Sequence, residues 1–285
     1  PMLTIASAMS GRPLFYSPKD NREDAEKKKR AFAVGKSDHL AVVNAFDGWL
    51  NAKKRGGRGA ERRFCDENYL SSQALEAVLQ SRVDFAQILS DLGFVSRNYA
   101  LRVKRFGRAK DDTANSSYGN KNIGGGLKDE VDVNSNVSRI IKAALVAGLY
   151  PKLVRAQHPV AKYAKTIGGA VEKMASGREM KYYSRDVGRV FLHPTSVNFN
   201  VGKYESTWLV YGDRVQTSKV FVRDCTMVGS YPLLLFGGEL DVKHEQGKLV
   251  LDDWCEFNAP AKIGVLAREL RKKIDQLLTN KVNSP

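Results

Sequence analysis

The sequence is poor in cysteine and histidine, with three cysteines and four histidines among 285 residues. No two cysteines form a CxxC pair and the histidines stand apart from one another, so a structural zinc site is not expected. An odd, sparse set of cysteines also argues against a disulfide framework and favours a reducing compartment. The cysteine pattern therefore predicts an intracellular protein.

Long hydrophobic runs are absent as well. The most apolar run, Tyr231 to Phe236, is far shorter than the roughly 18 residues that a membrane span needs. The N-terminus also lacks the basic and then apolar layout of a secretory signal, so no membrane partner is expected. The chain opens with Pro1 rather than Met, which favours a segment of a longer protein.

Signatures of catalysis are missing. Gly35-Lys36-Ser37 is similar to the end of a phosphate-binding loop, but that loop needs a glycine five residues before Gly35, where Arg30 stands. No Gly-x-Ser-x-Gly elbow occurs, and no nucleophile or metal set can be assigned. We therefore expect no catalytic site and no cofactor in this segment.

Positive charge is abundant. The chain contains 46 Lys and Arg and 31 Asp and Glu, which gives a net charge of +15. Such an excess favours a polyanionic partner, because each phosphate contact releases a condensed counterion. A merely soluble basic protein is the alternative interpretation, and nucleic acid is the favoured one.

The hydrophobic period changes along the chain. Residues 1–95 have apolar residues at helical spacing, with helix starts near Asp20 and Ser37 and at Ser72. Residues 97–135 show no hydrophobic periodicity. Their first part is basic, and their second part is rich in Asn, Ser and Gly. Such a composition buries too little apolar surface to offset chain entropy, which predicts a mobile insertion.

After a helix at Ser138 to Leu149, the period becomes two, and six short segments are predicted strands. They favour a small β-barrel, because closure removes exposed edges. A final helix is expected from Pro260, with an apolar stripe of Ile263, Leu266, Leu270, Ile274 and Leu277. The predicted fold class is α+β, with a helical domain at 1–96, an insertion at 97–135 and a barrel domain with flanking helices at 136–285.

One candidate binding segment is a basic stretch interrupted by three glycines. It is either a solvated loop or a loop that follows phosphates, since glycines permit close backbone approach. Its cations are Lys53, Lys54, Arg55, Arg58, Arg62 and Arg63.

Two further candidate segments border predicted strands. Imidazole, hydroxyl and ammonium groups at a barrel rim can stack on and hydrogen-bond unpaired bases. The candidates are His193, Thr195 and Ser196, followed by Thr217, Ser218 and Lys219. Tyr182 and Tyr183 are neighbours on a predicted strand, so one faces the core and the other faces outward as a candidate stacking platform.

Several strings, in this order, resemble the C-terminal part of DEAH/RHA-type ATP-dependent RNA helicases. Residues 3–15, 37–49 and 65–71 look like their helical ratchet-like domain. Residues 140–151 look like the lead into an oligonucleotide-binding (OB) fold. The strings His193-Pro194-Thr195-Ser196 and Thr217-Ser218-Lys219, with residues 223–226 and 231–238, look like that fold. The resemblance covers nearly the whole chain except about 97–135.

The resemblance implies a ratchet-like domain followed by an OB-type β-barrel with a C-terminal helix. It assigns ATP and Mg²⁺ to motor domains that precede this segment, and it makes those motor domains a partner. It also implies single-stranded or structured RNA as a ligand, held by the rim residues already named, and assembly into a ribonucleoprotein.

We therefore expect an RNA-binding accessory region that guides and grips single-stranded RNA during unwinding or ribonucleoprotein remodelling. The alternative is a structural scaffold that docks on a ribonucleoprotein or a protein partner. A self-contained enzyme is disfavoured, because no catalytic constellation is visible.

Overall fold

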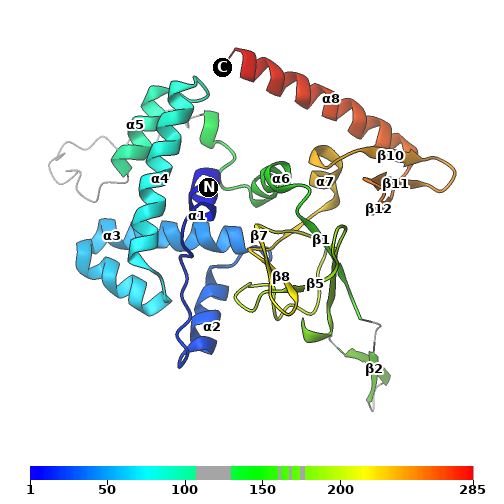
Figure 1. Cartoon of the computed structure of the whole chain (residues 1–285), viewed down its shortest axis with the longest axis horizontal. Coiled ribbons are helices and arrows are strands. Elements are labelled where there is room, and N and C mark those ends of the chain that lie inside the picture. The colour runs from blue at the N-terminus through cyan, green and yellow to red at the C-terminus, as the bar shows by residue number, and fades with distance from the viewer. Residues whose placement is uncertain (107–129, 160–161, 167–168, 174–176, 285) are drawn as a thin grey trace. The chain divides into compact units, whose positions relative to one another are not determined.

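The computed structural model describes residues 1–106, 130–159, 162–166, 169–173 and 177–284 (Figure 1). The chain forms two compact units. The helical unit comprises Pro1–Phe32, Leu40–Ile141 and Asn280–Pro285, and the barrel unit comprises Ala33–His39 and Lys142–Thr279. None of the helices within the described ranges is long and apolar enough to cross a membrane.

The helical unit is built on the apolar spacing that predicted it. Phe46, Trp49, Leu75 and Val78 are fully or almost fully buried and form the centre of its core. Helix α4 packs against α1 and α5 (Figure 1). The helices are α1 (Met2–Met9), α2 (Arg22–Phe32), α3 (Asp38–Asn68), α4 (Ser72–Asp91) and α5 (Arg97–Phe106).

The basic, glycine-containing segment is helical, so the prediction of a loop there is wrong. Residues 53–63 lie within α3, which bends at Gly57 (φ 60°, ψ −155°). That backbone conformation is open to glycine because it has no Cβ. Gly57 therefore bends a helix, and the segment does not form a phosphate-binding loop.

The predicted insertion begins with a helix. The Ser96 hydroxyl accepts a hydrogen bond from the Tyr99 N–H at 3.1 Å and caps α5. Tyr99 and Ala100 are buried against Ala86 of α4, which anchors the helix despite its many cations. A short 3₁₀ helix covers Glu130–Asp132. Residues 107–129 of the predicted insertion lie outside the described residues.

The barrel unit contains a curled seven-stranded sheet in the order β7-β8-β5-β4-β1-β6-β9. Its pairs are antiparallel, except that β5 and β8 are parallel. The strands are β1 (Leu153–Gln157), β4 (Lys181–Ser184), β5 (Gly188–Leu192), β6 (Trp208–Val210), β7 (Asp213–Gln216), β8 (Val220–Arg223) and β9 (Thr226–Val228). One face carries the buried core, which includes Val154, Tyr182, Leu209 and Val222. The predicted α+β fold is confirmed.

Smaller elements complete the unit. Strands β2 (Lys162–Thr166) and β3 (Gly169–Lys173) pair antiparallel. A three-stranded sheet holds β10 (Leu240–Lys243), β11 (Lys248–Leu251) and β12 (Cys255–Asn258). Helix α7 (Ser230–Phe236) and a 3₁₀ helix at Gly177–Glu179 lie within the barrel unit, whereas α6 (Ser138–Leu149) belongs to it from Lys142 and α8 (Ala261–Asn283) as far as Thr279.

Two of the predicted strands, at 219–228 and 248–257, are each divided in two. Asp224 (φ 53°) separates β8 from β9, and Asp252 and Asp253 (φ 49° and 58°) turn the chain between β11 and β12. Aspartate tolerates this left-handed conformation better than most residues. The apolar period continues through these turns, which is why the sequence alone suggested single strands.

The edge of the sheet at β9 is covered by residues at and just before the start of α3. The Met227 N–H donates to the Lys36 carbonyl, and the Asp38 N–H donates to the Cys225 carbonyl, both at 3.0 Å. An unpaired edge strand exposes a row of hydrogen-bonding groups, and this segment occupies them. Residues 33–39 therefore belong to the barrel unit.

Candidate nucleic-acid interface

Side chains of β4, β5 and β8 alternate between the core and the outer face of the sheet, as strand geometry requires. Val190 and Leu192 of β5 are buried, whereas Arg189 and Phe191 point the other way. Tyr183 of β4, next to the buried Tyr182, also lies on the outer face, which confirms the prediction for this tyrosine pair.

Strand register brings these outer side chains together. Tyr183 lies opposite Arg189, and Phe191 lies opposite Phe221 of β8. The Phe191 and Phe221 ring centroids are 6.0 Å apart. Half-buried rings from three strands thus gather on one surface.

Cations lie over these rings. The Arg189 guanidinium carbon is 5.8 Å from the centroid of the Tyr183 ring and 5.2 Å from that of Phe191. The Lys219 ammonium, on the turn between β7 and β8, is 4.7 Å from the Phe191 centroid. Tyr183, Arg189, Phe191, Lys219 and Phe221 are called the aromatic–cation row below.

His193 follows β5 and continues the row, with its ring 6.0 Å from that of Phe221. Its Nε2 lies 3.1 Å from Nη2 of Arg223, and its Nδ1 lies 2.7 Å from the Thr195 hydroxyl. The Thr195 N–H also donates to Nδ1, at 3.3 Å, so both ring nitrogens of His193 have polar partners. These contacts hold the ring in one orientation.

The other rim candidates divide into exposed and buried residues. Thr217, Ser218 and Lys219 are exposed in the turn between β7 and β8. Ser196, in contrast, is only 6% exposed, and its hydroxyl donates to the Asp38 carboxylate. Ser196 was expected to face RNA, and the structure instead gives it a role in holding the fold.

Two acidic side chains near the outer face, Asp186 and Glu256, are each paired with a cation. Asp186, after β4, accepts from the Ser184 hydroxyl and from the Arg214 guanidinium, and these contacts hold the pKa of Asp186 below its usual range. Glu256 of β12 contacts Lys248 at 2.8 Å, which likewise lowers the pKa of Glu256. Because their negative charges are paired, these two carboxylates repel an anionic ligand less strongly.

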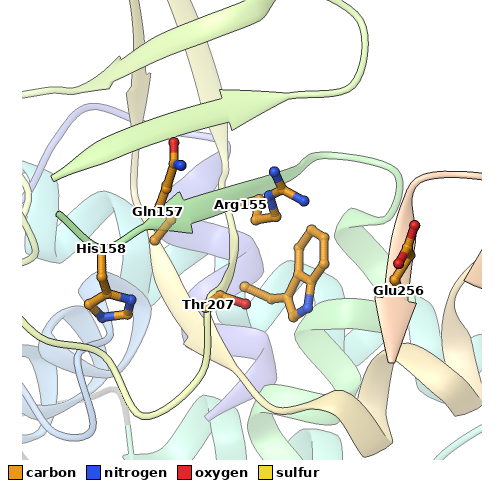
Figure 2. Close-up of a pocket in the computed structure, with 7 residues that line it drawn as sticks. Arg155, Gln157, His158, Thr207 and Glu256 are labelled. Atoms are coloured by element: carbon orange, nitrogen blue, oxygen red, sulfur yellow. The ribbon is translucent and has the colours of Figure 1, made fainter. Parts of the chain in front are cut away.

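An open cleft borders the row at β1, where Arg155 lies opposite Tyr183. Figure 2 shows Arg155 and Gln157 on β1. It also shows Glu256, which lies on β12. His158, Thr207 and Trp208 complete the lining, together with Ala156. Within the described ranges, no cluster of three or more His, Cys, Asp or Glu side chains is arranged to hold a metal ion.

The basic segment of α3 belongs to the helical unit. Lys53 is 12% exposed, contacts the Glu76 carboxylate and lies 4.6 Å from the centroid of the Trp49 ring, so its charge is already engaged. Arg62 lies 3.9 Å from Asp66. Lys54, Arg55, Arg58 and Arg63 are exposed, and their contact with RNA stays a prediction.

Sequence reasoning did not single out Arg189, Phe191 and Phe221. Their alternation with buried residues was visible in the sequence, but each looked like an ordinary strand residue. Arg189 and Phe191 share β5, and the parallel pairing of β5 with β8 brings Phe221 beside Phe191; a parallel partner is not adjacent in sequence.

Comparisons with known proteins agree with this architecture. The family described as the oligonucleotide/oligosaccharide-binding (OB) fold matches residues 141–240, and the family described as the C-terminal domain in RNA helicases matches residues 247–285.

The whole chain is similar to named helicases. It is 36% identical to human DHX57, whose name describes an ATP-dependent RNA helicase, and 34% identical to the human ATP-dependent DNA/RNA helicase DHX36. It is 32% identical to the DExH-box ATP-dependent RNA helicase DExH1 of Arabidopsis thaliana. Each match covers 100% of this chain but only 20%, 25% and 24% of the respective relative. Together with the α+β fold and the curled sheet, these matches show that the chain belongs to the DEAH-box RNA helicases, as a region that carries their OB fold and helicase C-terminal domain.

Proposed function

We propose that this region binds RNA and holds the single strand while a DEAH-box helicase unwinds or remodels its substrate. The observation that supports this most directly is the outer face of the barrel sheet. There, the aromatic–cation row and the oriented His193 present rings, guanidinium groups and an ammonium on one surface.

Electrostatics favours an anionic ligand at this face. Arg155, Lys181, Arg189 and Lys219 are exposed on β1, β4, β5 and the turn before β8. The whole chain carries a net charge of +15. Phosphate contacts by such cations are expected to dominate affinity and to make it depend on salt.

The helicase activity is a proposal about the whole protein, since the chain spans a fifth to a quarter of the relatives that it matches. In this proposal, motor domains bind ATP and Mg²⁺ and contact the present region. This region positions the strand and contributes no reacting group.

Fluorescence anisotropy of a labelled single-stranded RNA, measured with the 285-residue chain across a salt series, tests the proposal. We expect affinity to fall linearly in log salt, and His193→Ala and Lys219→Ala each to weaken binding about five-fold or more, the lower end of what loss of one stacking contact costs. Lys219→Ala is also expected to reduce the salt slope by about one.

Lys243→Ala is the matched control, because Lys243 is an exposed cation on β10, away from the aromatic–cation row. It should change affinity much less than Lys219→Ala. Lack of RNA binding at low salt, or equal effects of all three variants, would contradict the proposed site.

A docking scaffold is the second candidate function, and the exposed leucines of α8 favour it. Leu266 and Leu277 are 64% and 68% exposed, although they belong to the predicted apolar stripe. Limited proteolysis with and without RNA separates the two functions. Protection by RNA supports the RNA-binding role, and protection only by a protein partner supports the scaffold.

A further inference from the structure

We propose that Arg189, whose guanidinium lies over the rings of Tyr183 and Phe191, is a stacking platform for one unpaired nucleobase and binds the adjoining phosphate. This site is additional to the rim formed by His193 and Thr195. It rests on the proposed function and names the part of RNA that the sheet face recognises, namely the face of an exposed base.

The first support is the way in which Arg189 is held. Its backbone lies opposite Tyr183 in the antiparallel pair of β4 and β5, and Phe191 is two residues further along the same strand. All three side chains therefore point to the outer face. The guanidinium lies within 6 Å of both ring centroids, the range of a cation–π contact.

The second support is that the charge of Arg189 is not used by the fold. Among the residues that the structure describes, no carboxylate pairs with Arg189 and no hydrogen bond from its guanidinium is found. Arg214 of β7 is also exposed, but it is paired with Asp186. Arg189 is thus an exposed cation that two rings orient and that leaves its donors to solvent.

The chemistry of guanidinium defines the ligand. Its planar face stacks on nucleobases, and its edge donates two parallel hydrogen bonds to a phosphate. An orientation fixed in advance reduces the conformational entropy lost on binding. A base paired within a helix has its faces covered by its neighbours, so the platform accepts a base that is unpaired and unstacked.

The neighbours of Arg189 extend the same surface. Lys219 lies on the Phe191 side, and Lys181 and Arg155 lie on the Tyr183 side, on adjacent strands. Strands are spaced by ~4.8 Å, so these cations form a track across the sheet rather than along one strand. A single strand crossing the sheet can place a base on Arg189 and its flanking phosphates on the lysines.

The test compares Arg189→Lys with Arg189→Ala. Lysine keeps the charge but lacks the planar face, so it separates stacking from charge. The probes are a labelled single-stranded oligouridylate and an oligomer of equal length and charge whose central residues are abasic. Anisotropy with the 285-residue chain gives the affinity for each probe.

We expect Arg189→Lys to weaken binding of the oligouridylate about five-fold or more, and to change binding of the abasic oligomer less than two-fold, since stacking on one base accounts for the difference. Arg189→Ala should weaken both. Because Arg189 is exposed, the circular dichroism spectrum and the melting temperature of each variant should match those of the parent chain.

Three outcomes would overturn the inference. If Arg189→Lys binds both probes as the parent does, the guanidinium face is not used. If it weakens both probes equally, the effect is not stacking. If polyglutamate displaces the oligouridylate as well as unlabelled RNA does, the face is a docking site for acidic protein. In the first two cases the parent chain still binds RNA, so the proposed function stands; the third outcome, or no binding of RNA by the parent chain, would count against both.

Discussion

At the scale of single residues, the buried carboxylate of Asp38 joins three parts of the barrel unit. It is 1% exposed and accepts hydrogen bonds from the Val197 and Cys225 N–H groups, both at 2.9 Å, and from the Ser196 hydroxyl. A buried charge costs free energy unless such donors compensate it. Asp38 therefore fixes the turn that follows His193 and the end of β8 relative to residues 33–39.

Replacing this carboxylate tests its role. Asp38→Ala leaves buried donors unsatisfied and is expected to lower the free energy of unfolding by about 3–5 kcal/mol. Asp38→Asn keeps one acceptor oxygen but turns an amide N–H toward a donor, so it should cost an intermediate amount. Urea denaturation followed by circular dichroism measures both, and a loss below about 1 kcal/mol for Asp38→Ala would contradict this account.

At the scale of secondary-structure elements, α8 differs from the sequence pattern. Ile263, Leu266, Leu270 and Leu277 of its predicted apolar stripe are exposed and Ile274 is half-buried, whereas its buried residues are Gly264 and Ala267. A Cβ at Gly264 would lie 2.6 Å from side-chain carbons of Leu249 and Val242, so glycine allows the helix to approach the small sheet closely. The guanidinium groups of Arg268 and Arg271 add hydrogen bonds to backbone carbonyls of residues 233–240.

The sequence suggests that Leu266→Ala destabilises the fold more than Gly264→Ala does. The packing of α8 predicts the opposite order of destabilisation. Gly264→Ala should lower the free energy of unfolding by about 1–2 kcal/mol, because overpacking outweighs the gain in helix propensity. Leu266→Ala should change it by less than about 0.5 kcal/mol, since Leu266 is exposed. Thermal melts of the two variants side by side measure this, and a larger loss for Leu266→Ala would show that the stripe is buried.

At the scale of the whole molecule, the compact units do not coincide with continuous stretches of sequence. The OB family match begins at residue 141, yet residues 33–39 complete the barrel unit by covering β9 and by supplying Asp38. A domain drawn from sequence similarity alone therefore leaves out a structural part of the barrel.

A shortened chain tests this discontinuity. Residues 138–285 expressed alone lack the segment at β9, so we expect an exposed strand edge, lower stability and association between copies. Size-exclusion chromatography and a thermal melt compare this chain with the full 285 residues. A monomer that melts at the same temperature as the full chain would show that residues 33–39 are dispensable.

The sequence by itself determined the local features of this protein. Helical spacing in Phe46, Trp49 and Leu75, and period-two alternation around Tyr182 and Tyr183, are properties of consecutive residues, so the α+β class and the outward Tyr183 were predictable. The motif strings indicated the DEAH-box family for the same reason, since each string is short and continuous.

Only the tertiary structure decided which distant segments meet. The parallel pairing of β5 with β8 places Phe191 beside Phe221 and makes a surface around Arg189. The burial of Ser196 depends on Asp38, which lies 158 residues away. The exposed stripe of α8 depends on the close approach that Gly264 permits. Such contacts are set by packing between remote parts of the chain, and a local pattern carries no information about its partner.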